Sequence, residues 1–213
     1  MRATPGRLAA LALAALLAAA GCSGLLSRPP PEKQRFHLTL ERDETPESGS
    51  CACSVRVERV RVARTYERKR FVYRTGDAIF EEDFYHEFYA PPGELVQQAT
   101  GEWLAESGLF AKVLGASEGS LPDWLLEGRV RKLYADLRAG GEPQAVMEIE
   151  FMLLDARRRR AEPAFARRYG ATIRALARTP EAIHAAWSAS LERILASLEA
   201  DLREEPALLV GAR

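Results

Sequence analysis

The chain has 213 residues, and its 30 lysines and arginines balance 30 aspartates and glutamates, so the formal net charge is zero. This balance argues against binding driven by attraction to phosphate backbones, and we predict no nucleic-acid partner. The length fits one domain with a single hydrophobic core. Beyond the N-terminal segment, no apolar run reaches the roughly 18 residues that a membrane-spanning helix requires.

Residues 1–21 have the pattern of a bacterial lipoprotein signal peptide. Arg2 and Arg7 precede an apolar stretch of about a dozen residues, and small residues lead up to Cys22. The run Ala-Ala-Gly-Cys that ends at Cys22 resembles a lipobox. The resemblance implies cleavage before Cys22, a diacylglycerol on its thiol, and acylation of the new N-terminus, for example with palmitate. The alternative interpretation is an ordinary signal peptide followed by a chance cysteine, or a short membrane anchor.

Lipidation at Cys22 predicts a protein held at a membrane surface outside the cytoplasm, because each buried CH₂ of the acyl chains contributes about 0.8 kcal/mol. Ser23 stands where an aspartate would retain a lipoprotein at the inner membrane of a two-membrane bacterium. We therefore expect a lipid anchor in the outer membrane, with the protein facing the periplasm. Residues 22–35 form the expected proline-rich tether, with a reach of roughly 35–40 Å. The folded domain is expected over 36–204, followed by a tail over 205–213.

Two further cysteines, Cys51 and Cys53, remain once Cys22 is lipidated. They share the alternating phase of Val55 and Val57, which favours thiols that point into the core as small apolar groups. A local disulfide is the second interpretation, because Cα atoms two residues apart in a strand lie ~6.5–7 Å apart, at the edge of bridgeable distance. A metal site is the third, although no nearby histidine or second cysteine pair would complete four ligands.

Alternating apolar residues predict strands along much of the domain, and interruptions of that alternation predict where the strands are irregular. The apolar phase slips by one residue near Glu58 and again near Arg131, which predicts a β-bulge at each place. Turns around Gly76 and Gly140 are expected to reverse the chain between strands. The first predicted strand covers 36–40.

Two stretches have the apolar spacing of helices. The first runs from Pro92 to about Ser107, with Gly108 where a C-terminal cap is expected. The second begins after the N-cap Thr179 and ends near Glu204. These elements predict an α/β fold, alternatively described as α+β. It is a single domain whose mixed, mostly antiparallel sheet of about six or seven strands is covered by two main helices.

No catalytic motif stands out in the sequence. It contains no nucleophile elbow, no phosphate-binding loop and no zinc-binding helix motif. His86 could act as a base with Asp83 or Glu87, but residues three apart in a regular strand point to opposite faces, so Asp83 and His86 are not expected to pair. We therefore predict a protein that is not an enzyme and that needs no cofactor or metal.

An aromatic segment supplies the candidate partner-binding residues Phe84, Tyr85, Phe88 and Tyr89. Aromatic edge strands are natural docking sites, either for another subunit's strand or for an apolar ligand, and packing within the domain is the alternative. The arginine run 157–160 most simply forms a solvated hairpin tip. Its functional alternative is contact with acidic lipid headgroups or with an acidic patch of a partner.

Several segments together resemble the ABC-type transport auxiliary lipoproteins, the PqiC-like group. The order and spacing of these segments carry the resemblance, which covers roughly 36–202 together with the lipobox. The matching segments are 71–76, 83–92, 103–110, 125–128 and 133–134.

The resemblance implies a lipoprotein without catalytic residues that works with an inner-membrane ABC permease and ATPase and with an MCE-domain protein. Such systems move phospholipids or other apolar molecules between the two membranes and support envelope integrity. We therefore predict a non-enzymatic accessory subunit of an intermembrane lipid transport system, acting as a monomer or as a homo-oligomeric ring. The alternative is a scaffold lipoprotein for outer-membrane assembly or secretion.

Overall fold

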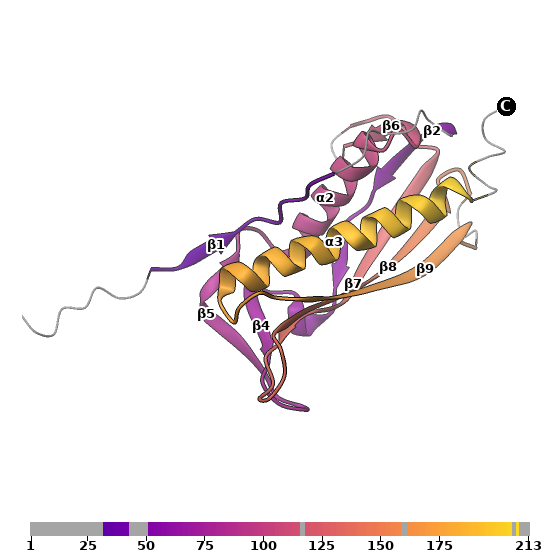
Figure 1. Cartoon of the computed structure of the whole chain (residues 1–213). Helices are drawn as coiled ribbons and strands as arrows, with labels where there is room; N and C mark the ends of the chain where they lie inside the picture. Colours follow the sequence, from indigo (N-terminus) through magenta and orange to yellow (C-terminus); the bar gives the residue numbers. More distant parts are fainter. Residues whose placement is uncertain (1–31, 43–50, 116–117, 159–161, 206–207, 209–213) are drawn as a thin grey trace, which may run out of the picture. The chain divides into compact units, whose positions relative to one another are not determined.

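The described part of the chain comprises residues 32–42, 51–115, 118–158, 162–205 and 208 of a computed structural model (Figure 1). The chain divides into two units, Met1–Glu32 and Lys33–Arg213, and the fold below is that of the second unit. The predicted signal peptide, Cys22 and most of the tether lie outside the described residues, as does almost all of the C-terminal tail.

A nine-stranded sheet forms the centre of this unit. In chain order its strands are β1 (Gln34–Phe36), β2 (Cys51–Val57), β3 (Arg61–Val62), β4 (Arg70–Arg74), β5 (Phe80–Phe88), β6 (Phe110–Leu114), β7 (Trp124–Asp136), β8 (Gln144–Asp155) and β9 (Phe165–Arg174). Antiparallel pairing joins β4 to β5, β7 to β8 and β8 to β9, and the other described pairs are parallel. The predicted mixed sheet is confirmed, and its longest registers are antiparallel.

The long strand β7 organises the sheet. One of its edges pairs with β8 over the full length of the strand. The other edge is shared by three shorter strands, first β2, then β3 and finally β4. From that edge the sheet divides into two branches. The first branch runs β4–β5–β1, and the second runs β2–β6.

The sheet has more strands than the six or seven expected, and one of the additional strands arises because the chain is interrupted near Glu58, where a bulge is predicted, so that β2 and β3 are separate strands. Val60 lies in the break with its side chain buried. Two glycines leave room for it, since a Cβ on Gly93 would lie 2.4 Å from the Val60 carbonyl oxygen and a Cβ on Gly128 would lie 2.9 Å from Val60 Cγ2. The second predicted irregularity is confirmed as a shift in the β7–β8 register between Val130 and Lys132.

Two helices cover one face of the sheet: α2 (Pro92–Glu106) and α3 (Pro180–Arg203) (Figure 1). A single 3-10 turn, η1 (Arg64–Tyr66), precedes β4. The predicted caps are present. The Thr179 side chain accepts a hydrogen bond from the Ala182 N–H, and Gly108 has a φ of 65°, a left-handed conformation that few other residues adopt easily.

The two faces of β7, β8 and β9 differ as the alternation in the sequence predicts. The inward side chains of β8, such as Ile149 and Phe151, are fully buried under the helices. On the outer face, Glu148 and Glu150 form ion pairs with Arg131 and Arg168 of the neighbouring strands. This face is therefore a solvated surface of alternating charges, each pair of which contributes little to stability.

Residues 33–42 lead from β1 along α3. This path differs from the predicted strand over 36–40, because β1 ends at Phe36 and the following residues bond to helix side chains instead of a strand. His184 Nε2 donates to the His37 carbonyl oxygen at 3.0 Å, and the Glu41 N–H donates to Glu192 at 2.9 Å. The N-terminal segment is therefore built into the fold.

At the far end of this segment a buried carboxylate joins three elements. Glu199 of α3 accepts hydrogen bonds from Arg42 at 2.9 Å, from Trp103 Nε1 of α2 at 2.9 Å and from Arg203 at 2.7 Å. Burial alone would raise the pKa of Glu199, but the hydrogen bonds from Arg42 and Arg203 outweigh it and hold that pKa below its usual value. The carboxylate therefore stays ionised and fastens both helices to the N-terminal segment.

Candidate interaction site

Strand β5 and the residues at its two ends carry most of the large apolar side chains that the described residues expose. Seven such side chains are exposed, and five of them lie within 79–89. Three lie toward the C-terminal end of this segment, where Phe84 is 57% exposed, Tyr85 39% and Tyr89 62%. The rings of Phe84 and Tyr85 contact each other edge to face, with centroids 5.1 Å apart. We call Phe84, Tyr85 and Tyr89 the β5 patch.

The fourth predicted contact residue, Phe88, does not belong to this surface. It is only 1% exposed, and its ring packs against Phe71 at 4.8 Å and Trp187 at 5.4 Å. Phe88 therefore anchors β5 to the core beneath α3. The prediction that the three exposed aromatics contact a partner stays a prediction.

Cationic side chains surround the β5 patch. Lys33 Nζ lies 5.2 Å from the centroid of the Phe84 ring, and the Arg70 guanidinium lies 5.6 Å from it. Lys69 donates a hydrogen bond to the Tyr89 carbonyl oxygen at 3.0 Å. A cation at this distance from an aromatic face is attracted to the ring, so the patch combines apolar surface with positive charge.

Asp83 shapes the backbone of β5 next to the patch. Its Oδ1 accepts hydrogen bonds from the N–H groups of Tyr85 at 2.8 Å and His86 at 3.0 Å. The β4–β5 register shifts in the same region, between Arg70 and Val72. The strand is therefore bulged at Asp83, and a local side-chain-to-backbone motif holds the bulge in place.

The bulge overturns the expectation that Asp83 and His86 cannot pair. His86 Nδ1 lies 2.7 Å from Asp83 Oδ2, and the Tyr73 hydroxyl donates to the same oxygen at 2.8 Å. The geometry of a regular strand, on which the expectation rested, does not apply at a bulge. Burial acts to raise the pKa of Asp83, but the hydrogen bonds from Tyr85, His86 and Tyr73 bring it below its usual value.

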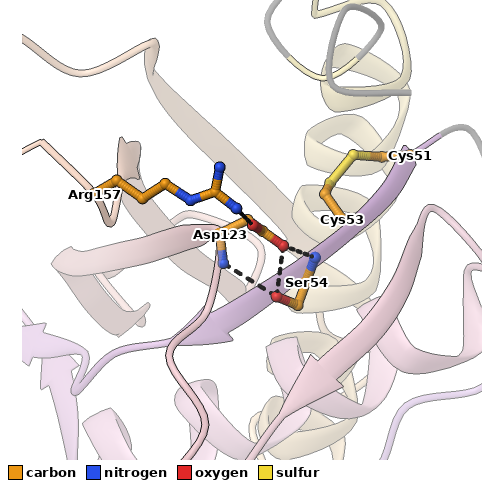
Figure 2. The surroundings of a disulfide bond; sticks show 5 residues. All are labelled: Cys51, Cys53, Ser54, Asp123 and Arg157. Atoms are coloured by element: carbon orange, nitrogen blue, oxygen red, sulfur yellow. Dashed lines mark hydrogen bonds and ion pairs between the residues drawn. A yellow bond between two sulfur atoms is a disulfide. The ribbon is translucent and has the colours of Figure 1, made fainter. Parts of the chain in front are cut away.

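The two cysteines form a disulfide, Cys51–Cys53, with Cα atoms 5.1 Å apart (Figure 2). Both side chains are buried on the same face as Val55 and Val57, as the alternation predicts. The favoured interpretation as free thiols is wrong, and the second interpretation holds. The strand can bring the two cysteines closer than a regular spacing allows because the β2–β6 register shifts between Cys51 and Ser54.

Beside the disulfide, Asp123 ties β2 to the segment that leads into β7 (Figure 2). Its Oδ2 accepts hydrogen bonds from the Ser54 N–H at 2.9 Å and the Ser54 hydroxyl at 2.8 Å, and Arg157 forms an ion pair with Oδ1. The Ser54 hydrogen bonds, followed by the charge of Arg157, lower the pKa of Asp123. Arg157 thus forms an ion pair within the domain, and residues 159–160 of the predicted basic tip lie outside the described residues.

The fold is shared with solved structures of other proteins. A crystal structure of a Xanthomonas campestris protein of the family DUF330 aligns with a TM-score of 0.70 at 17% sequence identity, over 84% of this chain and 96% of that chain. A crystal structure described only as an uncharacterized protein aligns with a TM-score of 0.63 at 14% identity, over 80% and 99% of the two chains. At these identities the likeness shows the fold alone. The sequence itself matches no protein-family model and no curated protein.

None of the helices in the described ranges combines the length and apolar character that a membrane crossing requires. Within the same ranges, no group of three or more His, Cys, Asp or Glu residues is placed to hold a metal ion.

Proposed function

We propose that the protein is a non-enzymatic lipoprotein subunit of an ABC- and MCE-type intermembrane lipid transport system. In this proposal Cys22 carries the lipids that hold the chain at the periplasmic face of the outer membrane. The domain would contact an inner-membrane permease and ATPase complex through an MCE-domain protein, as one copy or as a homo-oligomer. The substrate class is phospholipid or another apolar molecule.

One observation in the structure supports this function best. Five of the seven exposed large apolar side chains in the described residues lie on β5 or directly beside its ends, within 79–89, and β5 is the strand that pairs with β1 at the start of the N-terminal segment. An exposed aromatic surface beside the point where the lipid-bearing segment joins the domain fits a protein that acts by contact at a membrane. The order of the matching sequence segments supports the transport system in particular.

Affinity purification from native membranes tests the proposal. The full-length chain with a C-terminal tag is expected to bring down an ABC permease, an ATPase and an MCE-domain protein, identified by mass spectrometry. Cys22→Ser should lose these partners through mislocalisation. Recovery of outer-membrane assembly or secretion components in place of the transporter would favour the alternative scaffold function.

The non-enzymatic part of the proposal has its own test. The Tyr73–Asp83–His86 cluster is the nearest approach to a catalytic arrangement in this region, because a carboxylate positions a histidine. The purified protein should not hydrolyse phospholipid esters, and His86→Ala should leave envelope integrity unchanged. Ester hydrolysis that disappears in His86→Ala would overturn the proposal.

A further inference from the structure

We propose that the β5 patch rests on the lipid headgroup surface of the membrane that holds the Cys22 anchor. This inference rests on the proposed lipidation of Cys22, and it assigns the lipid bilayer, rather than a protein strand, as the surface that Phe84, Tyr85 and Tyr89 contact. Four features of the structure support it: position, charge, side-chain chemistry and the state of the strand edge.

The β5 patch lies where the N-terminal segment enters the domain. Lys33 lies over the Phe84 ring and forms an ion pair with Glu87 of β5 at 3.4 Å. Only eleven peptide units separate Lys33 from Cys22. A chain of that length spans at most about 40 Å, so the patch can never lie far from the lipid surface once Cys22 is anchored.

The charge around the patch complements an anionic surface. Five bases lie in or just before β1 and β4, and two acids of β5 are each paired with two of these bases. The bases are Lys33, Arg35, Arg68, Lys69 and Arg70, and the acids are Glu82 and Glu87. Two other acids of β5 bond elsewhere, Glu81 to Thr75 and Asp83 to Tyr73 and His86. These acids offset the charge of the bases over the whole region, but the groups that lie against the exposed residues are bases: Lys33 and Arg70 at the Phe84 ring, and Lys69 at the Tyr89 carbonyl.

The side chains themselves suit the headgroup region. Tyrosine and other aromatic rings concentrate at the membrane–water interface, where an apolar ring can be buried while polar atoms stay hydrated. Arg70 and Lys33 flank Phe84, and long cationic side chains place their charges at the level of lipid phosphates. Each base near an anionic surface contributes about 1 kcal/mol, so the aromatic and cationic groups act together.

The edge of β5 is poorly suited to the competing occupant, an added protein strand. Strand addition needs free backbone N–H groups along the edge. Asp83 already accepts the N–H groups of Tyr85 and His86, and β1 pairs with the edge from His86 to Phe88. A bulge of this kind is a known protection of edge strands against pairing. A partner surface can therefore contact this edge through the exposed aromatic rings rather than through backbone hydrogen bonds.

Photolabelling in vesicles tests the inference without any transporter present. The lipidated full-length protein is reconstituted into phosphatidylethanolamine and phosphatidylglycerol vesicles that contain a diazirine phospholipid, and labelled peptides are mapped by mass spectrometry. We expect the peptide that contains Phe84, Tyr85 and Tyr89 to be the most strongly labelled part of the domain. Replacing all three with serine should reduce its labelling about tenfold, consistent with the loss of several interfacial contacts.

A matched control changes two exposed leucines outside the patch. Leu121 is 93% exposed and Leu176 is 97% exposed, so Leu121→Ser with Leu176→Ser removes comparable apolar surface. This control should leave labelling of the β5 patch unchanged. Labelling of the patch peptide no higher than that of the rest of the domain, with Cys22 shown to be lipidated by mass spectrometry of the same sample, would overturn the inference while leaving the proposed function intact.

A variant with one fewer positive charge, Lys69→Gln, distinguishes attraction to anionic headgroups from nonspecific apolar binding. Lys69 makes a hydrogen bond to the Tyr89 carbonyl and takes part in none of the described ion pairs, so Lys69→Gln removes a positive charge without exposing an acid. Labelling should fall by about fivefold in the anionic vesicles and should not change in phosphatidylcholine vesicles. Equal labelling of the variant and the original protein in the anionic vesicles would contradict the attraction to headgroup charge. Loss of patch labelling when other envelope proteins are added would point to a protein partner and count against the lipid surface.

Discussion

The two branches of the sheet leave the same edge of β7 but end in opposite ways. The β2–β6 branch is closed by cross-links: a disulfide within β2, and the hydrogen bonds of Asp123 to Ser54. The β4–β5–β1 branch ends in exposed aromatic rings and in a three-residue strand that continues into the N-terminal segment. The difference suggests that one branch is built for rigidity and the other for contact.

The largest expected effect comes from the buried carboxylate that links the N-terminal segment to both helices. Glu199→Ala should lower the free energy of unfolding by about 3 kcal/mol, because two partly buried arginines, Arg42 and Arg203, would lose their anionic partner. Urea unfolding measures this change. Glu192→Ala, which removes a hydrogen bond to the Glu41 N–H, is the control and should cost less than about 1.5 kcal/mol. Similar losses of unfolding free energy in the two variants would show that the Glu199 network does not stabilise the domain more than a single surface hydrogen bond does.

The second largest loss of stability is expected for a change at Asp83, because this residue holds the bulge in the β4–β5–β1 branch. Asp83→Ala removes the acceptor for two backbone N–H groups and for Tyr73, and we expect a loss of about 2–3 kcal/mol. Hydrogen exchange at Tyr85 and His86 should accelerate, while exchange in β2 and β6 should not change. Unchanged exchange at these two amides would mean that the bulge does not depend on the carboxylate.

The disulfide should contribute less to the free energy of unfolding than the Glu199 and Asp83 networks, although both of its cysteines are buried in β2. It encloses a single residue between Cys51 and Cys53, and closing so short a loop contributes only about 1.5 kcal/mol. Comparing urea unfolding of the oxidised and reduced protein checks this value. Hydrogen exchange should then rise in β2 and β6 and stay constant in β5. A loss as large as that of Glu199→Ala would show that the disulfide holds the whole sheet together.

Mild acid should have the smallest effect, and it should act through His184. Burial, which outweighs the hydrogen bond to the His37 carbonyl, lowers the pKa of His184 in the folded protein. As the pH falls below the usual histidine value near 6.5, the unfolded chain therefore takes up the proton first and stability decreases. His184→Gln should flatten the fall in urea midpoint between about pH 7 and 5. A fall of the same size in this variant would assign the effect to another group.

Local patterns in the sequence account for much of the fold. The alternation through Cys51, Cys53 and Val55 places these side chains on one buried face, and the phase slip at Arg131 marks a true bulge. Thr179 and Gly108 mark helix ends because capping depends on neighbouring residues only. These features are set by contacts within a few residues, which a sequence pattern contains.

The candidate site was less predictable because its geometry depends on departures from regular structure and on distant contacts. Aromatic content identified Phe84, Tyr85 and Tyr89, but it did not separate them from the buried Phe88. The bulge could have been suspected, since an aspartate followed by two N–H donors is a common local motif. The partners of Glu199 could not have been predicted from the sequence, because Arg42 lies 157 residues away in the chain.

The N-terminal segment also determines how the domain would respond to a mechanical load on its anchor. A pull at Lys33 reaches β1 first, where three residues and two exposed ion pairs resist it. Behind them, the buried junction of Arg42 with Glu199 is a much stronger point of attachment. Detaching only the part between Lys33 and Arg42 would add about 30 Å of extended chain while the helices and the rest of the sheet stay folded. The segment can therefore extend under load by a fixed length, up to the Arg42–Glu199 ion pair, before the load reaches the helices and the rest of the sheet.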